Sequence, residues 1–132
     1  MLAPGVHAIS KSALATVKRK IHDSGVRVFQ LTTHDARTRA NLFDEMRAVL
    51  PFDPPLIGST SWDAFEDSLW GGLDELPECR IVIMWEGSAK IRACAPADYA
   101  IAVDVFQHVT ASLLNPVFTD DDPTELRVYI SD

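Results

Sequence analysis

Apolar residues follow two different spacings along the chain. Some short segments are rich in β-branched and aromatic residues, which is typical of strands, and the run at residues 80–85 is almost wholly apolar, as in a strand buried on both faces. Between these segments, apolar residues recur every three or four positions, as on one side of a helix. The sequence predicts strands over residues 5–9, 26–31, 80–85 and 126–130, and helices over residues 12–21, 35–49, 61–76 and 97–114.

Capping and proline residues set the expected element boundaries. Asp35 is a suitable N-cap for the second helix, and the proline-rich segment 51–55 ends that helix. Pro96 is expected to open the last helix, because proline is tolerated in a first turn. Since strands alternate with helices, the sequence predicts an α/β fold with a small parallel sheet covered by helices.

Composition and charge exclude several classes of function. The chain has 132 residues, with 12 Lys and Arg against 19 Asp and Glu, and a formal net charge of −7. This size predicts one domain, and the acidic balance argues against a nucleic-acid partner. The sequence contains no apolar run long enough to cross a membrane, no secretory signal pattern, and no metal-ligand spacing among its histidines. Neither a membrane partner nor a cofactor is expected.

The two cysteines, Cys79 and Cys94, do not form a disulfide framework or a Cys-x-x-Cys motif. We expect both to be reduced, which favours a cytoplasmic location.

The segment 61–76 is the one with candidate functional chemistry. On a helix, one apolar stripe should face the core, and it consists of Trp62, Phe65, Leu69, Leu73 and Leu76. A second stripe carries Asp63, Asp67 and Asp74, with Trp70 pointing the same way and Glu66 between the two stripes. Carboxylates four residues apart repel each other slightly on a helix. The stripe is either a solvated face or a docking surface for a basic cleft with Trp70 as its aromatic anchor.

The same segment resembles the barstar family, cytoplasmic inhibitors of ribonucleases of the barnase type. The resemblance rests on the motif Trp62-Asp63-Ala64-Phe65 within residues 58–69, on the segments 82–87 and 95–99, and on the helix that ends at Leu114. It covers about residues 26–131. It implies a barstar-like domain over residues 26–132, whose sheet has three strands. Residues 1–25 would add a fourth strand and a helix packed on the same domain.

The resemblance also implies a set of partner-binding residues. The first aspartate of the family's helix and the one four residues later enter the ribonuclease active site, where they stand in for substrate phosphate. These positions are Asp63 and Asp67, with Glu66 beside them and with Trp70 and Gly71 at the rim of the same surface.

Some positions of this surface differ from the family pattern. Where the family has an aromatic residue before a glycine, this chain has Ile57 before Gly58. His108 occupies the place of a glutamate in the late helix, Ser61 replaces an asparagine cap, and Ser68 replaces a cysteine. These differences favour a ribonuclease other than barnase, because specificity requires matched contacts.

Three functions are compatible with these residues. The first is an immunity protein that binds a basic ribonuclease toxin in a 1:1 complex and blocks its active site without catalysing a reaction. The second is an enzyme in which Asp63 and Asp67 form an acid/base pair, which would require both to lie in one cleft. The third is a barstar-fold binding module for a partner that is not a nuclease.

Overall fold

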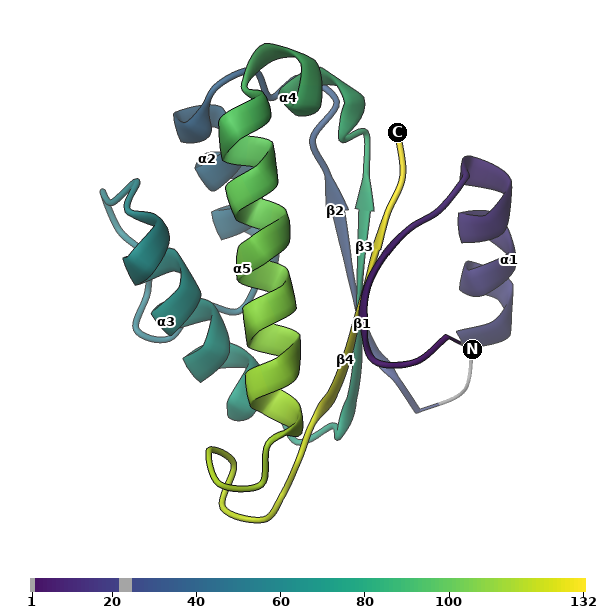
Figure 1. The fold of residues 1–132 in the computed structure, drawn as a ribbon, viewed down its shortest axis with the longest axis vertical. Coiled ribbons are helices and arrows are strands. Elements are labelled where there is room, and N and C mark those ends of the chain that lie inside the picture. Colours follow the sequence, from purple (N-terminus) through teal and green to yellow (C-terminus); the bar gives the residue numbers. More distant parts are fainter. Residues whose placement is uncertain (1, 22–24) are drawn as a thin grey trace.

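One parallel sheet forms the centre of the computed structural model, which describes residues 2–21 and 25–132 (Figure 1). Its strands are β1 (Gly5–Ala8), β2 (Arg27–Thr32), β3 (Arg80–Glu86) and β4 (Glu125–Ile130), in the order β1-β4-β3-β2. The helices are α1 (Lys11–Ile21), α2 (Arg39–Val49), α3 (Trp62–Asp74), α4 (Ala89–Cys94) and α5 (Pro96–Leu114). This architecture confirms the predicted α/β fold, including the additional N-terminal strand.

The central strand β3 is buried on both faces, as predicted from its composition. Ile81, Ile83 and Trp85 belong to the large core beneath α2, α3 and α5. The alternate residues Val82 and Met84 belong to a second core on the other face of the sheet. Successive side chains of a strand point to opposite faces, so one apolar strand supplies both cores.

The N-terminal segment covers the second face of the sheet. Strand β1 pairs with β4 at one edge, while β2 lies at the other edge, so α1 crosses over the sheet between them (Figure 1). Leu14 and Ile21 of α1 are buried against Val82, Met84 and Tyr129. Without α1, these three side chains of β3 and β4 would lose their apolar cover.

Replacing Leu14 by alanine tests whether residues 1–25 belong to the same folding unit as the remainder. Leu14 is 2% exposed. We expect the substitution to lower the free energy of unfolding by about 2–5 kcal/mol, because it removes buried methyl groups and leaves a cavity. The transition is followed by the fluorescence of the three tryptophans, all of which lie after residue 26. Leu114→Ala, at a position 39% exposed, is the control and should change stability by less than about 1 kcal/mol. An unchanged Leu14→Ala midpoint would mean that the extension unfolds separately.

The predicted start of the second helix at Asp35 is wrong. After β2, the Thr33 amide donates a hydrogen bond to the Glu86 carbonyl at 3.0 Å, so the chain follows β3 beyond the end of the strand and then turns. The helix begins at Arg39, where the Thr38 side chain caps it by accepting a hydrogen bond from the Asn41 amide at 3.2 Å. The capping preference of Asp35 therefore did not decide where the helix begins, because the hydrogen bond from Thr33 to Glu86 keeps the preceding segment beside β3.

A short helix was missed between β3 and α5. Helix α4 has six residues, of which Ile91 is buried. Such a length is less than two turns and shows no readable periodicity. Pro96 is the first residue of α5, as predicted.

Candidate functional site

Helix α3 buries the apolar stripe that the sequence predicted. Phe65, Leu69 and Leu73 are fully buried, and Trp62 and Leu76 are partly buried against the same core. The opposite side of the helix therefore faces away from the sheet. That side carries the acidic residues.

The first turns of α3 present two carboxylates to solvent. The Ser61 hydroxyl caps the helix by accepting a hydrogen bond from the Ala64 amide at 3.4 Å. Asp63 and Asp67 are exposed, and no ion pair with either is found among the described residues. Asp63 lies in the first turn, where the helix dipole favours negative charge. The helix backbone thus fixes where the two side chains leave α3, while their charges have no ion-pair partner among the described residues.

Asp98 of α5 connects three helices at the start of α3. Its Oδ1 accepts a hydrogen bond from Arg39 Nε of α2 at 2.7 Å and one from Trp62 Nε1 at 3.1 Å. Trp62 also packs against the core. This network fixes the first turn of α3 relative to α5, and thereby the position of Asp63.

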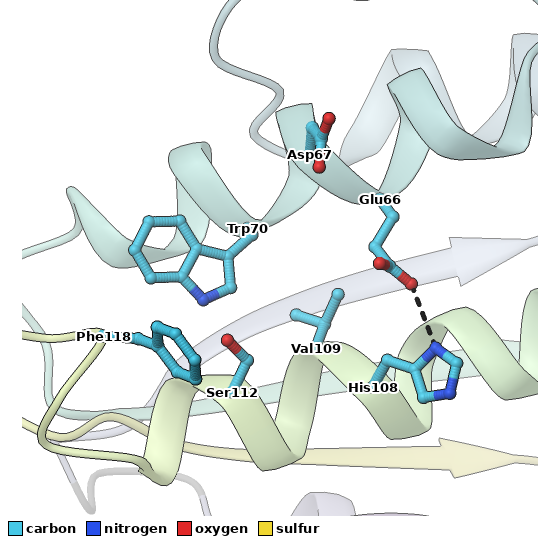
Figure 2. A pocket seen from close by; sticks show the side chains of 7 residues that line it. All are labelled: Glu66, Asp67, Trp70, His108, Val109, Ser112 and Phe118. Carbon is cyan, nitrogen blue, oxygen red and sulfur yellow. Dashed lines mark hydrogen bonds and ion pairs between the residues drawn. The ribbon is translucent and has the colours of Figure 1, made fainter.

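A pocket of about 320 Å³ opens between α3, α5 and the loop that follows α5 (Figure 2). Its lining residues are Glu66, Asp67, Trp70, His108, Val109, Ser112 and Phe118. At one end, Nδ1 of His108 lies 3.3 Å from Oε1 of Glu66, an interaction that joins the two helices across the pocket mouth. The pocket thus combines apolar walls with two carboxylates.

The predicted orientation of Trp70 requires a correction. Helical spacing predicts that its side chain points the same way as the exposed carboxylates and has no role in the core. In the structure, Trp70 is partly buried and packs against the main core, while its indole also lines the pocket (Figure 2). A tryptophan is wide enough to reach the core from a position about a quarter turn away from the apolar stripe.

The loop before α3 is held by an arginine of α2. Arg47 donates hydrogen bonds from Nη1 to the carbonyl of Leu56 at 3.2 Å and to that of Ser59 at 2.9 Å. Between these two residues, Ile57 is 85% exposed, and Gly58 has a positive φ of 66°. An apolar side chain is therefore held in solvent by a fixed loop.

Two glycines of α3 allow the same loop to approach the helix backbone. A Cβ on Gly71 would lie 2.4 Å from the Asp53 carbonyl oxygen, and one on Gly72 would lie 1.4 Å from that of Pro51. Gly71 therefore contacts the loop, in addition to the rim role that the resemblance implied.

The Asp53 side chain raises the pKa of Glu75 above its usual value, first through a hydrogen bond and then through its negative charge.

The structure brings together four of the predicted residues, Glu66, Asp67, Trp70 and His108, around one pocket. The other four, Asp63, Ile57, Gly58 and Gly71, do not line it. Three further lining residues, Val109, Ser112 and Phe118, were not predicted from the sequence. Ser112 follows His108 by four residues, so helical spacing could have predicted that the two side chains lie on the same face of the helix.

The geometry gives little support to catalysis or to metal binding. Asp67 lines the pocket but Asp63 does not, so the pair shares no cleft there. Within residues 2–21 and 25–132, no group of three or more histidine, cysteine or acidic side chains is arranged to hold a metal ion. Cys79 and Cys94 are free and exposed. In the same part of the chain, no helix has the length and apolar character needed to cross a membrane.

Comparison with known protein families agrees with the resemblance to the barstar family. The model of the family described as barstar (barnase inhibitor) matches residues 26–131, which include the whole of α3 and the pocket. Searches of curated proteins and of solved structures returned no match. The matched segment covers three of the four strands and leaves β1 and α1 outside it. The chain therefore belongs to the barstar family of barnase inhibitors.

Proposed function

We propose that this protein is an immunity protein that inhibits a basic ribonuclease toxin in the cytoplasm by forming a 1:1 complex. The observation that carries the proposal is the exposed acidic face of α3, which lies in the segment that matches the barstar family. Asp63, Glu66 and Asp67 are the contacting carboxylates, with Trp70, Gly71, Ile57, Gly58 and His108 around them.

The inhibition is steric and electrostatic. A ribonuclease active site holds cationic side chains that bind the phosphates of RNA. Asp63 and Asp67 are free of intramolecular ion pairs in the described part of the chain, so both are available to such cations. The inhibitor occupies the site in place of the substrate, and no covalent bond is made or broken.

A second function is favoured by two particular residues. Ile57 presents an exposed apolar side chain beside the acidic face, and His108 contacts Glu66, one of its carboxylates. Both features reduce the acidic character of the surface. They suit a binding module for a protein partner that is not a nuclease.

Titration of a ribonuclease with this protein tests the first function. The enzyme is the ribonuclease encoded beside the gene, and the readout is cleavage of RNA. We expect cleavage to stop at one equivalent, and the association rate to fall as ionic strength rises, because salt screens the attraction between acidic and basic surfaces. Recovery from cells of a bound partner that lacks nuclease activity, together with full RNA cleavage in the titration, would favour the second function.

A further inference from the structure

The indole N–H of Trp70 has no hydrogen-bond acceptor in the part of the chain that the structure describes. The other two tryptophans have one: Trp62 Nε1 donates to Asp98, and Trp85 Nε1 donates to Thr33 Oγ1 at 2.8 Å. Trp70 Nε1 is shielded from solvent and has no hydrogen-bond partner within residues 2–21 and 25–132. Three other buried side-chain atoms of the described residues also lack a partner, Glu78 Oε2, Tyr129 Oη and Ser131 Oγ, but Trp70 is the one that lines the pocket between α3 and α5. A buried donor without an acceptor is costly, so an acceptor supplied by a pocket occupant would be favourable.

This N–H lies on the pocket side of the indole. Figure 2 shows the nitrogen on the ring edge that faces Ser112 and Phe118. Phe118 belongs to the loop after α5 and is 58% exposed, and the neighbouring Val117 is 80% exposed. Because the Trp70 nitrogen is shielded from solvent, an occupant can reach it only if a lining side chain moves, and Phe118 is an exposed lining side chain on that side of the pocket. The pocket wall therefore contains an unpaired donor and, beside it, an exposed aromatic side chain.

The chemistry around the pocket defines what would occupy it. Trp70, Val109 and Phe118 provide apolar and aromatic walls, which suit a flat ring. The unused indole donor and the Ser112 hydroxyl require a polar atom at the inner end of that ring. Among the described residues, Asp67 has no ion pair and Glu66 pairs only with the His108 ring, so the two carboxylates favour a positive charge at the mouth.

We propose that the pocket is a specificity subsite that receives a tyrosine side chain of the ribonuclease, next to an arginine that pairs with Glu66 and Asp67. The tyrosine oxygen accepts the hydrogen bond from Trp70 Nε1, and its ring lies between the indole and Phe118. A phenylalanine would leave the indole donor unpaired, and an arginine side chain has no acceptor for it. The identity of the partner as a ribonuclease rests on the proposed function, whereas the chemistry of the pocket occupant does not.

Titration with capped dipeptides tests the subsite without any ribonuclease. The intact protein, labelled with ¹⁵N, is titrated with acetyl-tyrosyl-arginine amide while the indole N–H resonance of Trp70 is followed by NMR. The matched probes are acetyl-phenylalanyl-arginine amide, which lacks the hydroxyl, and acetyl-tyrosyl-glutamate amide, which reverses the charge. We expect the first peptide to shift this resonance at a concentration roughly five-fold lower than either control, since one hydrogen bond or one exposed charge pair contributes about that factor.

Two exposed positions of one loop provide matched variants. Phe118→Ala should weaken binding of the tyrosyl-arginine peptide about five-fold, while Val117→Ala, at a residue that does not line the pocket, should leave it unchanged. An unshifted Trp70 resonance, or equal binding of all three peptides, overturns the subsite. Failure to inhibit a ribonuclease would instead overturn the proposed function, because the peptide titration does not involve one.

Discussion

Replacing Asp67 by alanine is expected to weaken binding of the ribonuclease by about 2–5 kcal/mol, or roughly 30-fold to several thousand-fold in the dissociation constant. Asp67 is exposed in the free protein and reaches the pocket mouth, so the complex would bury its charge against cations of the enzyme. Truncation leaves those cations buried without a partner, which accelerates dissociation. Titration calorimetry and stopped-flow dissociation measure the two quantities.

The same substitution should have the opposite effect on the stability of the inhibitor alone. Asp63 and Asp67 repel each other across one helical turn, so removal of one should stabilise the free protein by a few tenths of a kcal/mol. Asp35→Ala removes an equal charge from the turn between β2 and α2 and is the control. Equal loss of binding in the two variants would show that net charge, rather than the α3 face, governs the interaction. Unchanged inhibition by Asp67→Ala would place the site elsewhere.

Replacing Gly72 by alanine is expected to destabilise the protein by about 3 kcal/mol, the upper end of the usual range for overpacking. An alanine inside a helix normally increases stability relative to glycine by about 0.5–1 kcal/mol. Here the added Cβ would lie 1.4 Å from the carbonyl oxygen of Pro51, a backbone atom that cannot rotate away. The loop that carries Ile57 would have to separate from α3. Urea unfolding measures the loss.

Gly58→Ala provides the comparison for this prediction. A Cβ at Gly58 would meet no atom within 4 Å, although its φ of +66° is unfavourable for other residues. We expect this variant to lose only roughly 1 kcal/mol. If Gly72→Ala instead stabilised the protein, as at an ordinary helical glycine, the close contact between the loop and α3 would be wrong.

The two substitutions examine different requirements of the same surface. Asp67 supplies charge and contributes little to folding, whereas Gly72 supplies no chemistry and allows the loop to pack against α3. Arg47 has a related role, because its hydrogen bonds hold the loop carbonyls on both sides of Ile57 and Gly58. The position of the candidate binding surface therefore depends on contacts that do not themselves face the partner.

Local patterns were sufficient for most of the secondary structure. The apolar run of β3 predicted a strand buried on both faces, and the i, i+4 spacing of α3 separated its buried side from its acidic side. Both predictions depend on interactions within a few residues, which the order of side chains encodes directly. The α/β class followed because strands and helices alternate. The predicted start of α2 was wrong because Thr33, which precedes the helix, donates its amide to Glu86 at the end of β3, about 50 residues away, and the helix begins only after the following turn.

The sequence by itself determined the four strands, the four longer helices apart from the start of α2, the acidic face of α3 and the family resemblance. Only the tertiary structure decided that β1 lies beside β4 and that α1 covers the second face of the sheet. It also decided that Trp70 reaches the core, and that Phe118 and Ser112 complete a pocket with Glu66 and Asp67. The physical reason is distance along the chain. Periodicity specifies which side of a helix is apolar, but the neighbour on that side is chosen when segments more than 40 residues apart pack together.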